Sequence, residues 1–154
     1  MMQNAVDIKN LSHYYGSYSV LKEISFSIPK GRFFIIICPN GSGKTTLLKS
    51  ISGIEKARNE KLDILGKPIT EYSRRALART IALVPQMVTI DFPFTVMELV
   101  LMGRSPYLGI LGLEEEKDLE IAREAISFTG VEHLSDRKLD QLSGGERQRG
   151  FIAR

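Results

Sequence analysis

Residues 38–46, CPNGSGKTT, combine glycines, a lysine and two threonines in a pattern suited to binding phosphate. Glycines let successive backbone N–H groups turn toward one centre, and a helix that begins there adds the positive end of its dipole. A lysine amine behind such a turn can bridge the β- and γ-phosphates of a nucleotide, and a threonine hydroxyl can ligate Mg²⁺. We assign these two roles to Lys44 and Thr45. The residues expected to contact the nucleotide are Cys38, Asn40, Gly41, Ser42, Gly43, Lys44, Thr45 and Thr46.

The alternative is a glycine-rich turn that merely joins a strand to a helix. That alternative explains the glycines but not the lysine and threonine directly behind them. Cys38 departs from the G-x-x-x-x-G-K-[ST] pattern, which begins with glycine. A positive φ would make this side chain cost about 1–2 kcal/mol, whereas a negative φ would cost little. We expect the cysteine to weaken phosphate binding rather than abolish it.

A second candidate anion site lies in LSGGERQR, residues 142–149. Ser143 and Glu146 have the spacing of a capping box, and capping alone would explain them. It does not explain Gly144 and Gly145, which leave the start of the helix bare. A bare helix N-terminus with a hydroxyl and free N–H groups can bind an anion. Two phosphate-binding elements so far apart in the sequence suggest that one nucleotide is held between two copies of the chain.

Regular elements must position both loops. Alternation of apolar and polar residues predicts half-buried strands at 6–11 and 24–28. Continuous apolar runs predict further strands at 33–38 and 81–84, each covered on both faces as in a parallel sheet. Apolar residues at helical spacing predict a helix directly after the phosphate loop. The fold class is therefore α/β.

The remaining segments are a short strand at 61–65 and helices at 73–80 and 113–129. Thr95 and Glu98 predict another capped helix start. We expect four regions along the chain. They are an antiparallel β region at 1–30, the phosphate-loop core at 31–86, a helical subdomain at 87–141, and the LSGGERQR segment with its helix start at 142–154.

Composition excludes several classes of protein. The chain has 154 residues, of which 43% are hydrophobic and 25% charged, as in ordinary globular domains. A net charge of +3 is too mild to indicate nucleic acid as a partner. One cysteine allows no internal disulfide. No apolar run reaches the roughly 18 residues of a membrane span, and no signal peptide opens the chain, so we expect a cytoplasmic protein.

Taken together, the phosphate loop and LSGGERQR resemble the N-terminal part of an ATP-binding subunit of an ABC transporter. The resemblance implies a P-loop ATPase core with an N-terminal antiparallel β subdomain and a helical subdomain, and it implies ATP and Mg²⁺ as cofactors. In that family the LSGGERQR motif, the signature, closes over the ATP bound to a second copy. This implies contacts in trans from Ser143, Gly144, Gly145 and Glu146.

The same resemblance lends roles to two further residues. Tyr15 matches the aromatic residue that stacks on adenine, although it could also be a surface tyrosine beside Tyr14 and Tyr18. Gln86 matches the glutamine that touches Mg²⁺ and the attacking water. The implied catalytic residues are thus Gln86 and Lys44, and the implied metal ligands are Thr45 and Gln86.

The segment FPFTVMELVLMGRSPY, residues 92–107, resembles the helical subdomain of importers for iron–siderophore, haem or cobalamin. An ordinary amphipathic helix before a proline turn is the alternative. The resemblance implies transmembrane permease subunits and a second ATPase copy as partners, at the cytoplasmic face of the cell membrane.

Two departures bear on activity. Gly150 stands where the signature helix usually has a bulky aliphatic residue. The 154 residues also end before the apolar strand with the Asp-Glu pair that would hold Mg²⁺ and polarise water. We therefore expect the chain alone to be inactive in hydrolysis. A P-loop kinase or GTPase would leave LSGGERQR unexplained, whereas a non-hydrolysing, nucleotide-dependent interaction module would fit these residues as they stand.

Overall fold

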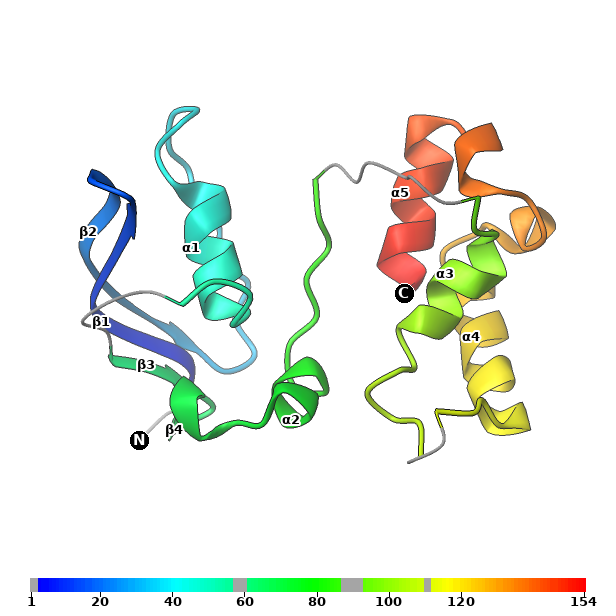
Figure 1. The fold of residues 1–154 in the computed structure, drawn as a ribbon, viewed down its shortest axis with the longest axis horizontal. Coiled ribbons are helices and arrows are strands. Elements are labelled where there is room, and N and C mark those ends of the chain that lie inside the picture. Colours follow the sequence, from blue (N-terminus) through cyan, green and yellow to red (C-terminus); the bar gives the residue numbers. More distant parts are fainter. Residues whose placement is uncertain (1–2, 57–60, 87–92, 110–111) are drawn as a thin grey trace. The chain divides into compact units, whose positions relative to one another are not determined.

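The computed structural model describes residues 3–56, 61–86, 93–109 and 112–154 (Figure 1). The chain forms two compact units, Met1–Leu83 and Val84–Arg154, and each is described by itself. Residues 87–92 of the predicted helical subdomain lie outside the described part. None of the described helices is both long enough and apolar enough to span a membrane.

The first unit is built on a four-stranded antiparallel sheet (Figure 1). Its strands lie in the order β2-β1-β3-β4. The long hairpin of β1 and β2 confirms the strands predicted at 6–11 and 24–28, and β3 confirms the one at 61–65. The strand bounds are β1 Asn4–Tyr15, β2 Tyr18–Pro29, β3 Lys61–Ile64 and β4 Lys67–Pro68.

Helix α1 (Lys44–Ile51) packs on this sheet through Leu47, as the pattern after the phosphate loop predicted. The remaining helices of the unit are short: the 3-10 turn η1 (Ile69–Glu71) and α2 (Arg74–Ala78). Ser73 caps α2 by accepting a hydrogen bond from the Ala76 amide. The buried core of the unit consists of Ile8, Leu11, Leu21, Leu47, Leu62 and Ile64.

The strands predicted at 33–38 and 81–84 do not form, so that prediction is wrong. Both segments are irregular, and the side chains of Phe33 and Ile37 are 91% and 90% exposed. A strand requires a neighbour to accept and donate its backbone hydrogen bonds. Neither segment pairs with another strand among the described residues. Ile36 and Ile81 still pack against the core of the unit, whereas Phe33 and Ile37 remain uncovered.

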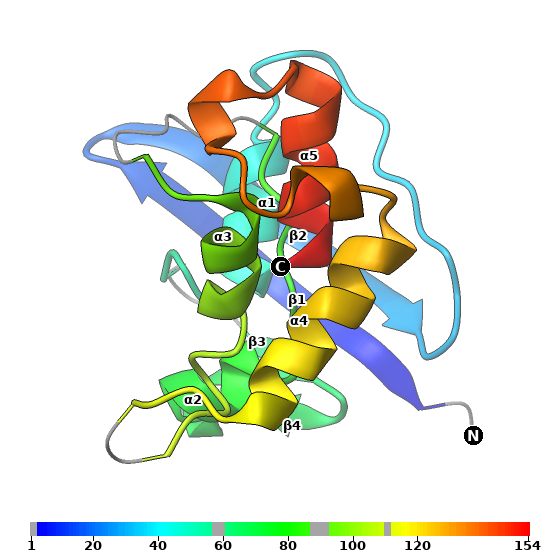
Figure 2. The same ribbon diagram turned by 90° about the vertical axis from the view of Figure 1, so that its right-hand side faces the viewer.

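The second unit is helical (Figure 2). Its long helix α4 confirms the amphipathic helix predicted at 113–129. Thr95 and Glu98 form the predicted capping box at the start of α3: the Glu98 amide donates to the Thr95 hydroxyl, and the Thr95 amide donates to the Glu98 carboxylate. The elements are α3 Val96–Met102, α4 Glu116–Phe128, η2 Glu132–Leu134, η3 Leu139–Gln141 and α5 Gly144–Ala153.

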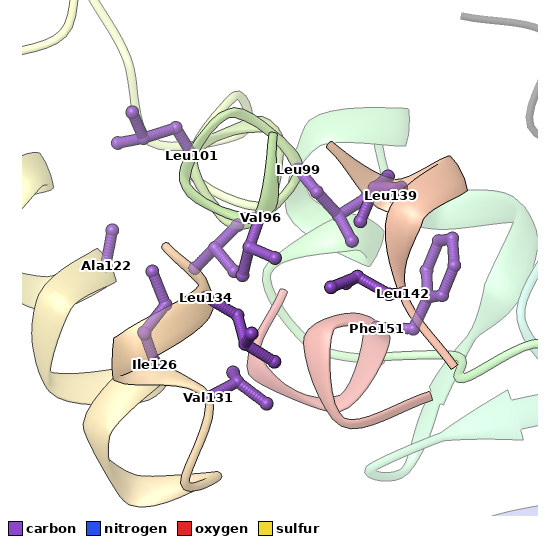
Figure 3. Packing of buried hydrophobic residues seen from close by; sticks show 11 residues of the cluster. Val96, Leu99, Leu101, Ala122, Ile126, Val131, Leu134, Leu139, Leu142 and Phe151 are labelled. Atoms are coloured by element: carbon purple, nitrogen blue, oxygen red, sulfur yellow. The ribbon is translucent and has the colours of Figure 1, made fainter. Parts of the chain in front are cut away.

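One apolar core holds the helices of the second unit together (Figure 3). Phe151 of α5 and Ile126 of α4 both lie in this core with residues of α3. Gly150 is buried on the face of α5 that points to α3, where an added Cβ would lie 3.6 Å from the Leu99 side chain. The missing side chain therefore leaves room for one methyl group.

Candidate nucleotide site

The phosphate loop depends on two glycines with left-handed backbone. Gly41 has φ of 79°, and Gly43, the N-cap of α1, has φ of 87°. A Cβ on Gly43 would also lie 2.8 Å from the Leu21 side chain and 3.0 Å from the Val20 carbonyl oxygen. Glycine is therefore required at Gly43 both by conformation and by the close approach of β2.

The Lys44 side chain folds back over the loop that precedes it. Its amine donates to the carbonyl oxygens of Cys38 and Pro39, at 2.7 Å each, and lies 3.5 Å from the Ser42 hydroxyl. The positive charge is thus held against the loop at the start of α1, where the helix dipole also favours an anion. The arrangement suits a polyphosphate.

The other loop residues differ in exposure. Asn40, Ser42 and Thr45 are exposed, so their polar groups are accessible to a ligand. Thr46 is buried, with 7% of the residue exposed. The described residues contain no group of three or more His, Cys, Asp or Glu side chains that could hold a metal ion.

Cys38 does not strain the loop. It is absent from the described non-glycine residues with positive φ, which are Asn10, Glu23 and Leu65. The Ser42 hydroxyl donates to the Cys38 sulfur at 3.0 Å. Of the two cases weighed for this position, the one that costs little therefore applies.

Tyr15 ends β1 and is half-exposed. Its hydroxyl donates to the carboxylate of Glu55 at 2.5 Å, and this bond is the main reason why the pKa of Glu55 is lowered. The Lys49 amine of α1 donates to the same carboxylate at 3.1 Å, which raises the pKa of Lys49. The imidazole Nε2 of His13 lies 3.3 Å from it.

Glu55 is not among the residues predicted from the sequence. This residue follows Tyr15 by 40 positions, and their contact depends on how β1 packs against α1. No motif marks the position. The available signal was the aromatic residue itself, whose hydroxyl has to find a partner when the ring is partly covered.

The signature segment forms the predicted capping box at the start of α5. The Glu146 carboxylate accepts from the Ser143 amide at 2.8 Å and from the Ser143 hydroxyl at 2.7 Å, and these bonds lower the pKa of Glu146. The Glu146 amide donates to the Ser143 hydroxyl at 3.4 Å. An added Cβ on Gly144 or Gly145 would meet no atom within 4 Å. Packing within the chain therefore does not explain either glycine.

Tyr15 and the phosphate-loop residues all belong to the first unit, and Tyr15 is linked to α1 through the Glu55 carboxylate, which also accepts from Lys49. Gln86 and the signature residues belong to the second unit. Gln86 is exposed, and it directly precedes residues that lie outside the described part. The two units are described separately, so the predicted contacts of Gln86 and the signature with nucleotide stay predictions.

Comparison with known proteins identifies the family of the chain. A sequence profile of the ABC transporter family matches residues 21–154. The chain belongs to this family. It is 39% identical over 139 residues to the ferric enterobactin transport ATP-binding protein FepC of Escherichia coli (strain K12), covering 90% of this chain and 51% of that protein.

Two further similarities point the same way. The hemin import ATP-binding protein HmuV of Gloeobacter violaceus (strain ATCC 29082 / PCC 7421) is 40% identical over 135 residues, covering 88% of this chain and 48% of that protein. A crystal structure of an ATP-binding cassette of an ABC transporter in its ADP conformation superimposes with a TM-score of 0.81 at 32% identity, covering 100% of this chain and 64% of that one. The chain thus spans about half the length of the curated relatives it matches.

Proposed function

We propose that this chain binds ATP as the energy-coupling subunit of an ABC-type importer. The observation that carries the proposal is the phosphate loop, in which two glycines have left-handed backbone and the Lys44 amine folds back over the loop at the start of α1. The LSGGERQR segment supports the same function, because its glycines lie open at a helix start. A kinase or GTPase would not account for that segment.

In this proposal each residue binds a different part of the nucleotide or its metal ion. Backbone N–H groups of residues 41–45 and the Lys44 amine hold the β- and γ-phosphates, and the half-exposed Tyr15 ring stacks on adenine. Mg²⁺, when bound, neutralises charge on the phosphates, and the exposed Thr45 hydroxyl and Gln86 are its proposed ligands. Ser143 and the signature glycines contact the ATP held by a second copy.

Calorimetric titration with ATP tests the phosphate loop. Replacing Lys44 by Ala removes the charge that faces the phosphates, so the affinity should fall at least about tenfold. The matched control is Lys22→Ala, which removes an exposed lysine of β2 and should leave the affinity unchanged. Equal ATP affinity in wild type and Lys44→Ala would overturn the proposal.

We further propose that the 154 residues do not hydrolyse ATP at a useful rate on their own. They contain no Asp-Glu pair after an apolar strand, and the loss of a general base alone typically costs about 10² to 10⁴ in rate. The alternative function is a nucleotide-dependent interaction module without turnover. Steady phosphate release by the purified chain, abolished by Lys44→Ala, would exclude both statements.

The class of solute is proposed from the relatives. The names of the two curated relatives describe ferric enterobactin transport and hemin import. We propose an iron–siderophore, haem or cobalamin importer, with transmembrane permease subunits and a second ATPase copy as partners at the cytoplasmic face of the membrane. Co-purification with a coexpressed permease of this class is the expected result. Its absence, with ATP binding intact, would contradict the assignment of partners.

A further inference from the structure

A group of four side chains joins the end of β1 to α1 and the turn that follows it. Its centre is the Glu55 carboxylate, whose side chain is 20% exposed. Tyr15, Lys49 and His13 all contact this carboxylate, at 2.5, 3.1 and 3.3 Å. The side-chain hydrogen bonds described for the phosphate loop involve Cys38, Pro39, Ser42 and Lys44 and do not include Glu55.

These contacts fix the Tyr15 ring at two places. The hydroxyl is bound to Glu55 at one end, and the His13 ring packs against Tyr15 in an edge-on arrangement, with centroids 4.8 Å apart and an interplanar angle of 71°. His13 is itself buried, so its ring restricts the movement of the Tyr15 ring. Tyr15 as a whole is 50% exposed, so part of the residue is accessible to a ligand.

Glu55 is also tied to the helix that begins at the phosphate loop. Its second carboxylate oxygen accepts from Lys49, which lies in α1 and contributes the last basic side chain of that helix. The carboxylate therefore connects the aromatic ring to the same helix whose first turn carries Lys44 and Thr45. Because the Tyr15 ring and the phosphate-loop residues are both attached to α1, the distance between them stays constant.

From this geometry we infer that Glu55 is the positioning residue of the base-binding side of the site: it sets the Tyr15 ring relative to α1 and so contributes to affinity for the nucleobase. The inference rests on the proposed function, since it needs Tyr15 to stack on a base. Ordering a ring before binding lowers the entropy cost of association, so the loss of its partner weakens binding.

Two probes separate the base from the phosphates: ATP, and inorganic tripolyphosphate, which has no base. Glu55→Ala should weaken ATP binding by about threefold to tenfold, the usual worth of one hydrogen bond, and leave tripolyphosphate binding unchanged. Tyr15→Phe removes only the hydroxyl and should do the same. The double variant should bind ATP no more weakly than Glu55→Ala, because that change already breaks the Tyr15–Glu55 hydrogen bond. Glu71→Ala, which removes an exposed glutamate of η1, is the matched control.

The outcomes distinguish a failure of the proposed function from a failure of the inference about Glu55. Wild-type chain that binds neither probe overturns the proposed function and the inference with it. Wild-type chain that binds ATP, with Lys44→Ala weakened for both probes but Glu55→Ala unchanged, overturns the inference alone. Equal weakening of both probes by Glu55→Ala also overturns it, because a general structural role would act on phosphate as well. Tyr15→Phe keeps the test valid if Glu55→Ala folds poorly.

Discussion

At the scale of the residue, the two unusual positions of the phosphate loop have opposite requirements. Gly43 is confined by a left-handed φ and by the side chain of Leu21. Cys38 has no positive φ and uses its sulfur only to accept from Ser42. A side chain is therefore harmless at one end of the loop and costly at the other.

Gly43→Ala should weaken ATP binding by at least about tenfold, because the new Cβ has to displace β2 or the start of α1 while adopting a strained φ. Cys38→Gly should change the affinity less than about twofold, since no strain is there to relieve. Calorimetric titration of both variants measures the pair. Tighter binding by Cys38→Gly would show that the cysteine does obstruct the loop.

At the scale of the element, Gly150 is the weak point of α5. Glycine costs about 1 kcal/mol relative to alanine inside a helix, and here a Cβ would make only ordinary contacts with Leu99 and Val96. Gly150→Ala should therefore raise the free energy of unfolding by about 1 kcal/mol. Denaturant titration measures it, with the exposed Arg149→Ala as a control expected to stay within about 0.5 kcal/mol. Destabilisation by Gly150→Ala would mean that α5 cannot approach α3 so closely.

The capping box of α3 should make stability depend on pH. Hydrogen bonds from the Thr95 amide and hydroxyl hold the pKa of Glu98 below its usual 4.5. A lowered pKa in the folded state stabilises the protein above the unfolded value, and this stabilisation is lost as the pH falls through the folded pKa.

Wild type should thus be more stable than Glu98→Gln at pH 7. The difference should shrink as the pH falls below the usual pKa of 4.5 and vanish below the lowered pKa of the folded state, where protonated Glu98 resembles glutamine. Urea titrations across this pH range measure the difference. Glu124→Gln, at an exposed position of α4, is the control. If wild type remained more stable than Glu98→Gln in acid, the stabilisation would come from the shape of the side chain rather than from its charge.

At the scale of the whole molecule, uncovered apolar segments should make the chain associate with itself. Phe33 and Ile37 are almost fully exposed on a segment without a pairing strand in the described part of the chain. Such surface favours contact with another copy.

The double change Phe33→Ser with Ile37→Ser should shift the purified chain toward monomer in sedimentation velocity. Phe128→Ser, which removes a single phenylalanine that is 92% exposed on α4, should have little effect. A monomeric wild type at the same concentration would contradict the expectation.

Local patterns predicted the elements that need only their own residues. The capping boxes at Thr95 and Ser143, the β1–β2 hairpin and α4 all follow from spacing and alternation within a short stretch. The strand predicted at 33–38 failed because its formation depends on a neighbour. Glu55 could not be found for a similar reason, since its role arises from a contact between β1 and the turn after α1.

The segment that precedes the signature helix α5 is hydrogen-bonded to the start of α3. The amides of Val96 and Met97 donate to the carbonyls of Arg137 and Ser135, and the Leu139 amide donates to the Phe94 carbonyl. Because these bonds cross between the same two segments, neither segment can detach without the other. Hydrogen exchange of their amides should therefore report one common free energy of opening, set by a single opening event. If the two segments opened independently, the amides of one would differ in opening free energy from those of the other, and this difference would be detected while the helices themselves are still folded.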